Sequence, residues 1–174
     1  MSENTPRRVT MFGNPMDLAG EEVRVGDSAP DFTAVDNDLK PVRLSDLTAK
    51  TIVLSAVPSL DTSVCDLETR RFNQEAGKLG DDVQIVTLSM DLPFAQKRWC
   101  GQTGVANVLT LSDHRHASFG QSYGVLLKDL RLLARCIFVL DHTRHINYVQ
   151  LVHEVTLEPD YNAVLEAVRA ARGA

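Results

Sequence analysis

Short apolar runs alternate along this chain with longer segments in which apolar residues recur every three or four positions. The runs are rich in β-branched residues and bounded by turn residues, which is typical of strands buried on both faces. They cover residues 51–57, 83–90, 107–111, 135–140 and 146–152. The helical pattern covers residues 64–79, 93–100, 114–123 and 160–172. This alternation predicts an α/β fold with a central sheet flanked by helices.

Two of the predicted helices have recognisable limits or faces. The helix over residues 93–100 begins at Pro93, a favourable first helical position, and we expect it to end before Gly101. In the helix over residues 64–79 we expect charges around most of the surface and apolar side chains near one face. The apolar residues are Val64, Leu67, Phe72, Ala76 and Leu79.

The first 25 residues hold two short strand-like pieces, 8–12 and 21–25, on either side of a Gly-Asn-Pro turn. We expect a β-hairpin here, as an extension over residues 1–25 of a single domain that spans residues 1–174. No apolar run approaches the roughly 20 residues that span a bilayer, and no apolar segment follows the two N-terminal arginines. We therefore expect no secretory signal, no membrane partner and a cytoplasmic location.

Composition narrows the chemistry further. The net charge of −5 argues against nucleic acid or an anionic membrane as a partner. The cysteines are too sparse for a disulfide scaffold, and no two are spaced for a structural zinc site; they are Cys65, Cys100 and Cys136. Two histidine pairs lack a neighbouring carboxylate or cysteine pattern, so we expect no metal; they are His114 with His116 and His142 with His145.

Cys65 lies where a predicted strand leads into a predicted helix. Asp61, Thr62 and Ser63 are all good N-cap residues, so Cys65 falls in the first turn whichever of them caps the helix. The unpaired N–H groups and positive dipole end found there favour a thiolate. An arbitrary cysteine is more often buried and inert, but these cap residues and the preceding Pro58 favour a reactive thiol.

Two segments carry a family resemblance. Residues 58–65, PSLDTSVC, resemble the Pro-x-x-x-Thr-x-x-Cys active-site motif of the peroxiredoxin family. Residues 91–100, DLPFAQKRWC, resemble the resolving-cysteine helix of its bacterial thiol peroxidase subfamily, of the atypical two-cysteine type. The match continues in order through residues 26–32, 133–135, 150–152 and 158–161. The resemblance implies a thioredoxin-like fold with an added N-terminal hairpin, and the activity of a thioredoxin-dependent hydroperoxide reductase.

The resemblance also implies a role for each matching residue. Cys65 is the peroxidatic cysteine, which attacks the peroxide and becomes a sulfenic acid. The Thr62 hydroxyl hydrogen-bonds the bound peroxide, Pro58 shields the site from water, and Arg135 lies against the thiolate and the peroxide. Cys100 is the resolving cysteine, which closes an intramolecular disulfide with Cys65. The implied partners are a hydroperoxide, thioredoxin as reductant and a second copy in a homodimer; no cofactor is needed.

Lowering a thiol pKa cannot by itself make a fast peroxidase. At pH 7 a thiol with a pKa of about 8.5 is roughly 3% ionised, and one with a pKa of about 6 is roughly 90% ionised. Nucleophilicity falls with the pKa, and this loss leaves a net gain of only a few-fold. The larger contribution must come from donors aimed at the breaking O–O bond, and Thr62 and Arg135 are suitable residue types.

The remaining candidates have simpler interpretations. An arginine at a strand end, like Arg135, usually reaches solvent, and only the resemblance favours a catalytic role. Alternation places Cys136 on the opposite face from Arg135, where we expect a small core residue. Cys100 lies in the last turn of its helix, where the dipole favours the neutral thiol. We expect Trp99 to anchor that helix.

Two other functions compete with the peroxidase hypothesis. A cysteine hydrolase or acyltransferase would use Cys65 as nucleophile and a histidine as base. A non-enzymatic redox sensor or chaperone would signal through Cys65 oxidation. The residues do not discriminate hydrogen peroxide from bulkier organic hydroperoxides.

Overall fold

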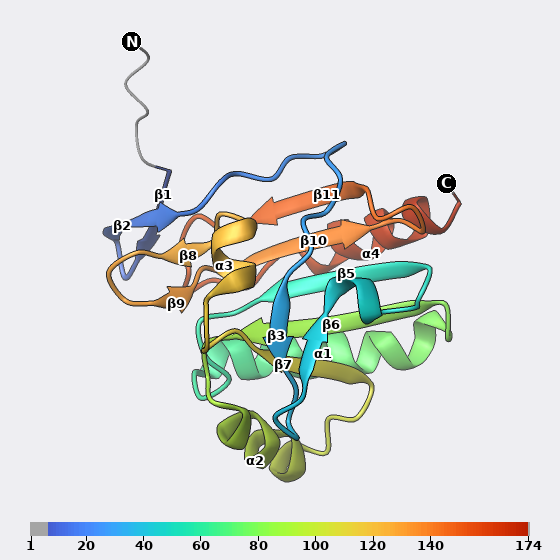
Figure 1. Ribbon diagram of the computed structural model, residues 1–174, viewed down its shortest axis with the longest axis horizontal. Helices are drawn as coiled ribbons and strands as arrows, with labels where there is room; N and C mark the ends of the chain where they lie inside the picture. The colour runs from blue at the N-terminus through green and yellow to red at the C-terminus, as the bar shows by residue number, and fades with distance from the viewer. Residues whose placement is uncertain (1–6, 174) are drawn as a thin grey trace.

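Residues 7–173, which the computed structural model describes, form a seven-stranded mixed sheet and a smaller four-stranded sheet (Figure 1). The large sheet has the order β11-β10-β5-β6-β7-β3-β4, with β5, β6 and β7 parallel and the other pairs antiparallel. Its strands are β3 (Thr33–Val35), β4 (Pro41–Arg43), β5 (Thr51–Ala56), β6 (Val83–Ser89), β7 (Val108–Ser112), β10 (Cys136–Leu140) and β11 (Ile146–Leu151). The five longest of these confirm the five predicted strands.

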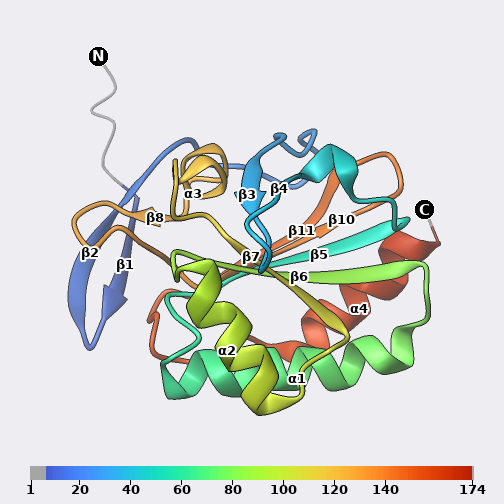
Figure 2. The same ribbon diagram turned by 60° about the horizontal axis from the view of Figure 1, so that its bottom comes forward.

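Helices cover both faces of the large sheet. One face carries α1 (Ser63–Leu79), α2 (Pro93–Thr103) and α4 (Tyr161–Arg172), which lie together below the sheet in Figure 2. The opposite face carries the short helix α3 (Ser118–Ser122), the 3-10 turn η1 (Leu44–Asp46) and the small sheet. The expected central mixed sheet flanked by helices is thus confirmed.

Alternation along the strands separates two buried clusters. On β10, Ile137 and Val139 pack with Phe72, Trp99 and the apolar face of α4. Their neighbours pack on the other face of the sheet, around an aromatic group; this group is Phe32, Phe119, Tyr123 and Phe138. Each strand of the sheet centre therefore buries side chains on both faces, as its continuous apolar sequence predicts.

The N-terminal hairpin is confirmed, but its second strand is not where the pattern placed it. β1 (Arg8–Met11) pairs with β2 (Asn14–Ala19), and residues 21–25 form no strand. The turn needs only Phe12 and Gly13, both with positive φ, so pairing resumes at once. β8 (Leu126–Leu127) and β9 (Leu132–Leu133) complete the small sheet. Residues 1–6 of the expected extension lie outside the described residues.

Two predicted helix limits also differ. α2 continues through Gly101 to Thr103 and ends at Gly104, whose φ of 68° is left-handed. The helix expected over residues 114–123 is only α3, because Ala117 has a φ of 48° that interrupts a regular helix.

The face of α1 that packs on the sheet is rotated from the predicted one. Leu67 is 54% exposed, whereas Cys65, Glu68 and Phe72 are fully buried. The buried positions still follow helical spacing of three and four residues. A glutamate therefore occupies a core position of this helix.

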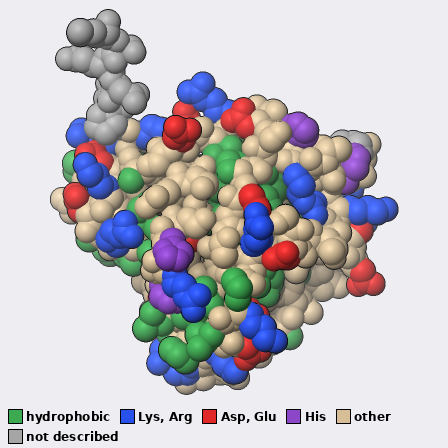
Figure 3. Space-filling view, viewed as in Figure 1, with side chains coloured by type: hydrophobic (Ala, Val, Ile, Leu, Met, Phe, Trp, Pro, Cys, Tyr) green, Lys and Arg blue, Asp and Glu red, His purple; other side chains and the backbone are tan. Residues whose placement is uncertain are grey.

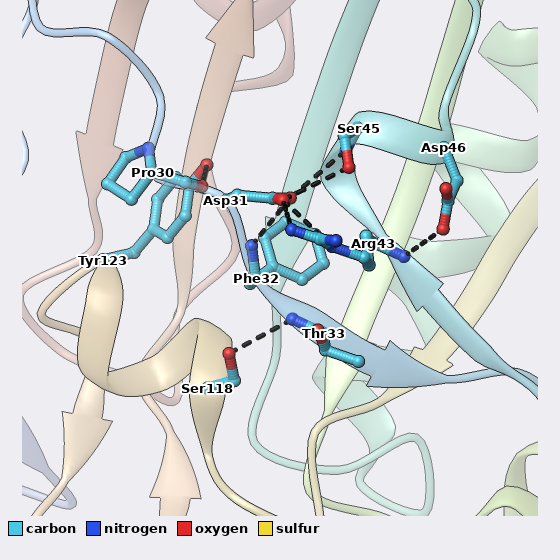
Figure 4. A network of polar contacts seen from close by, with 9 residues as sticks. All are labelled: Pro30, Asp31, Phe32, Thr33, Arg43, Ser45, Asp46, Ser118 and Tyr123. Carbon is cyan, nitrogen blue, oxygen red and sulfur yellow. Dashed lines mark hydrogen bonds and ion pairs between the residues drawn. The ribbon is translucent and has the colours of Figure 1, made fainter.

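Polar contacts fix the segment before β3. Figure 4 shows the Asp31 carboxylate accepting hydrogen bonds from the Arg43 guanidinium on β4 and from Ser45 in η1. The Tyr123 hydroxyl donates a hydrogen bond to the Pro30 carbonyl oxygen, 2.9 Å away.

Basic and acidic side chains are interspersed on the face shown in Figure 3. No helix within residues 7–173 combines the length and the apolar character that crossing a membrane requires.

Candidate active site

The loop between β5 and α1 places Cys65 at a helix start. Thr62 is the N-cap, with extended backbone angles, so Cys65 occupies the third position of α1. The Thr62 hydroxyl does not cap the helix; it donates to the Ser59 carbonyl oxygen, 2.8 Å away. The first-turn position expected for Cys65 is confirmed, and the free N–H groups of this turn favour negative charge on its sulfur.

Arg135 reaches the Cys65 sulfur from the residue just before β10. Its Nη2 donates to Sγ over 3.3 Å, and its Nη1 donates to the Glu68 carboxylate. All three side chains are at least 99% buried. Ser55 on β5 donates to the other Glu68 oxygen at 2.8 Å. Arg135 is thus a buried residue that bridges a thiol and a carboxylate, rather than an arginine that reaches solvent.

One cation therefore faces two acidic groups in a low-dielectric setting. Burial by itself would lower the pKa of Arg135, but the adjacent Glu68 and Cys65 outweigh burial and raise it, so the guanidinium stays charged. Burial raises the pKa of Glu68, against the lowering effect of Arg135 and Ser55. The charged Arg135 guanidinium, whose Nη2 donates to the sulfur, therefore places positive charge against a Cys65 thiolate.

A cavity of about 130 Å³ opens beside this cluster. Arg135 lines it, held in place by the hydrogen bond from its Nε to the Val155 carbonyl oxygen at 3.0 Å. Pro58 and Thr62 line it from the loop, and the remaining walls come from the hairpin, from the first turn of α1 and from the segment after β11; they are Met11, Phe12, Ser63, Val64, Val155 and Thr156. The structure thus brings four of the predicted site residues together; they are Pro58, Thr62, Cys65 and Arg135.

Asp91 fastens the active-site loop to the start of α2. One of its oxygens accepts from the Ser59 hydroxyl at 2.7 Å, and the other accepts from the Leu60 backbone N–H at 2.8 Å. The second oxygen also accepts from Ser89 at the end of β6. Because Asp91 lies two residues before the start of α2 at Pro93, the same carboxylate positions both cysteine-bearing helices.

Cys100 is half-buried on α2 and lies on the side of Thr110 and Asn37. Its sulfur is 3.6 Å from the Thr110 hydroxyl oxygen and 4.0 Å from the Asn37 amide nitrogen. No hydrogen bond joins it to Cys65 among residues 7–173, and both are free thiols. The neighbouring Trp99 is buried and donates its indole N–H to Asp66 on α1 at 2.8 Å, which confirms its role as an anchor.

The third cysteine and the histidines lie away from this chemistry. Cys136 is buried in the cluster on the opposite face, as expected, and burial raises its pKa. No histidine within residues 7–173 hydrogen-bonds to the Cys65 sulfur, as a cysteine hydrolase would require. Nor does that part of the chain contain a metal-ligating cluster of three or more His, Cys, Asp or Glu side chains.

Two polar residues of the site were missed by the sequence reasoning. The helical pattern assigns Glu68 to the charged, exposed part of the helix, although its spacing of three residues from Cys65 places both on one side of α1. Asp91 was noticed only as part of a motif, and no sequence signal connects it with Ser59, 32 residues away.

Known proteins match this chain over most of its length. The family model for Redoxin matches residues 24–165. The thiol peroxidase of Oceanobacillus iheyensis is 57% identical over 157 residues, which are 90% of this chain and 95% of that protein. The thiol peroxidase of Bacillus subtilis is 52% identical, covering 93% of this chain and 96% of its own. A solved peroxiredoxin-like protein from Aquifex aeolicus is 40% identical, with a TM-score of 0.89 over 95% of this chain and 98% of that one.

The chain therefore belongs to the Redoxin family, as a peroxiredoxin with the thioredoxin-like fold that the resemblance implied. Its extensive identity to curated thiol peroxidases identifies it further as an enzyme of that kind, a thiol peroxidase.

Proposed function

We propose that the protein reduces hydroperoxides through a cycle that uses Cys65 and Cys100. The Cys65 thiolate attacks the terminal peroxide oxygen, the O–O bond breaks, and the departing alkoxide or hydroxide takes up a proton. Cys65 becomes a sulfenic acid. The Cys100 thiol then attacks its sulfur, which forms the intramolecular disulfide and releases water. Thioredoxin reduces this disulfide and restores both thiols.

The observation that carries this proposal is the hydrogen bond from Arg135 to the sulfur of Cys65, in the first turn of α1. In the proposed cycle Arg135 stabilises the thiolate and the negative charge that develops on the leaving oxygen. Thr62, which lines the adjoining cavity, offers its hydroxyl oxygen to the peroxide, and Pro58 covers the reacting atoms.

Disulfide formation requires movement. A disulfide needs Cα atoms within about 7 Å, whereas a thiolate that attacks peroxide needs the sheltered helix start. We infer that the first turn of α1 unwinds, or that residues 93–104 shift, after Cys65 is oxidised. The contacts to be released are the Asp91 hydrogen bonds and the link from Trp99 to Asp66. Gly104, with its left-handed φ, provides a hinge at the end of α2.

The setting we propose is the cytoplasm of a bacterium, where the enzyme serves in antioxidant defence as a homodimer. Sparse cysteines and three free thiols are compatible with a reducing compartment, where thioredoxin is present. The relatives in Oceanobacillus iheyensis and Bacillus subtilis are bacterial.

The test is steady-state peroxide consumption with thioredoxin, its reductase and NADPH. Cys65→Ser should lose more than about 99% of turnover, because it removes the thiolate. Cys100→Ser should consume about one equivalent of peroxide and then stall as the sulfenic acid. Cys136→Ala is the matched control and should retain turnover.

Full thioredoxin-driven turnover by Cys100→Ser would remove Cys100 from the cycle. Peptide mass mapping of the oxidised wild type should give the Cys65–Cys100 link within one chain. A wild-type protein that becomes oxidised without turning over would support the redox sensor instead.

A further inference from the structure

The carboxylate of Glu154 joins the N-terminal hairpin to the segment that follows β11. Its Oε1 accepts from the Phe12 backbone N–H at 3.0 Å and from the Thr156 hydroxyl at 2.6 Å. Its Oε2 accepts from the Gly13 backbone N–H at 3.0 Å and from the Thr10 hydroxyl at 2.8 Å. Both N–H groups of the hairpin turn therefore end on one side chain.

Backbone contacts run beside this carboxylate. The Thr10 N–H donates to the His153 carbonyl oxygen at 2.6 Å, and the Val155 N–H donates to the Thr10 carbonyl oxygen at 2.8 Å. Val155 in turn accepts the hydrogen bond from the Nε of Arg135. The hairpin thus lies along the same segment that positions the arginine of the active site.

The turn that Glu154 holds forms one side of the active-site cavity. Met11 and Phe12 line it together with Pro58 and Arg135. Phe12 is 79% exposed and has a φ of 51°, a left-handed conformation that an aromatic residue adopts only when its surroundings impose it. An exposed aromatic residue that lines the cavity is therefore held in place by the hydrogen bonds that its own and the next backbone N–H donate to Glu154.

We propose that Glu154 is a positioning residue for substrate specificity: it holds Met11 and Phe12 as an apolar wall against the organic group of an alkyl or aryl hydroperoxide. This inference rests on the proposed peroxidase function of Cys65. Hydrogen peroxide has no organic group and gains nothing from the wall. Hydrogen bonds from Thr156 and Gly13 lower the pKa of Glu154 to about 2, so the carboxylate stays charged across the neutral range.

The test compares kcat/KM for cumene hydroperoxide with kcat/KM for hydrogen peroxide. Glu154→Ala should lower the value for cumene hydroperoxide about tenfold, the equivalent of about two buried methylene groups, and should leave hydrogen peroxide within about threefold. Phe12→Ala should change the ratio similarly while its backbone N–H still binds Glu154. Asp17→Asn, which removes an ion pair with Arg8 on the same hairpin, is the matched control and should leave the ratio unchanged.

Hydrogen exchange tests the clamp, meaning the hold of Glu154 on the hairpin turn, separately from the apolar wall formed by Met11 and Phe12. The Phe12 and Gly13 amides should exchange faster in Glu154→Ala but not in Phe12→Ala. Unchanged exchange in Glu154→Ala would refute the clamp, and an unchanged ratio in Phe12→Ala would refute the wall. An equal loss for both peroxides would mean that Glu154 acts through Val155 and Arg135 instead. If Glu154→Ala did not fold, Glu154→Gln, whose amide nitrogen cannot accept the hydrogen bonds made to one carboxylate oxygen, would test whether Glu154 holds the turn, and Phe12→Ala would test the apolar wall.

These outcomes are distinct from failure of the proposed function. If the wild type showed no peroxide turnover that depends on Cys65, the proposed peroxidase cycle itself would be wrong. If the wild type turned over both peroxides and the variants kept their ratio, only the role of Glu154 would be wrong.

Discussion

Arg135→Met should destabilise the protein by an amount that grows with pH, because it leaves Glu68 buried without a counter-ion. In the parent chain Glu68 is fully buried and accepts hydrogen bonds from Arg135 and Ser55. Methionine fills much of the same space but supplies neither charge nor donors. Measuring the effect in a Cys65→Ser background removes the contribution of the thiol.

The magnitude follows from the cost of protonating the stranded carboxyl. A buried, unpaired carboxylate takes up a proton instead of remaining charged, which costs about 1.4 kcal/mol for each pH unit above an unfolded pKa of about 4.3. The loss of unfolding free energy is therefore at most about 1 kcal/mol at pH 5 and at most about 3.7 kcal/mol at pH 7. The upper value agrees with the 3–5 kcal/mol typical of breaking a buried ion pair.

The sign is set by burial, which already raises the pKa of Glu68 in the folded parent chain; Arg135→Met removes the lowering effect of the guanidinium and raises this pKa further. The folded chain then keeps a proton that the unfolded chain releases. The variant therefore keeps its full unfolding free energy below the pKa that Glu68 has in the unfolded chain. It loses stability as the pH rises toward the pKa that Glu68 has in the folded chain. This direction is opposite to that of an ordinary surface carboxylate paired with a base.

Urea unfolding at pH 5 and pH 7 provides the assay, with the parent, Arg135→Met, Glu68→Gln and the double variant all in the Cys65→Ser background. Glu68→Gln in the double variant should abolish most of the pH dependence that Arg135→Met introduces. Other groups that interact electrostatically with Glu68, such as Glu158 and Cys136, are unchanged in this comparison. Equal destabilisation at both pH values, or a pH dependence that survives in the double variant, would refute the reasoning.

Three further predictions concern the active-site loop and its helices. Arg135→Met in the parent chain should still slow single-turnover peroxide attack at a pH where the thiol is fully ionised, and recovery of full speed there would contradict a role at the O–O bond. Asp91→Asn, with one acceptor oxygen, should lower the unfolding free energy by about 2 kcal/mol and speed hydrogen exchange over residues 59–62, whereas exposed Asp81→Asn should do neither. Gly104→Ala should cost about 1 kcal/mol in urea unfolding because its φ is left-handed, and an unchanged midpoint would exclude this strain.

Local sequence patterns are enough to predict most of the helices and strands and the position of Cys65. Apolar runs and helical spacing depend on neighbours a few residues away, and these local patterns predicted the strands of the sheet centre and the long helices. The cap residues before Cys65 likewise place it in the first turn of α1 without knowledge of anything distant. Where local signals were weak, as at residues 21–25 and 114–117, the prediction was wrong.

The tertiary structure decided which charges are buried and what they face. The local pattern around Arg135 is that of a strand-end residue that reaches solvent, and only the family resemblance places it against the thiolate; the pattern around Glu68 is that of a solvated helix face. Each side chain is buried only because the other, 67 residues away in the sequence, pairs with it. Glu154 meets the hairpin turn across a still longer separation. The cost of burying a charge depends on its partner in space, and no local pattern of residues records that partner.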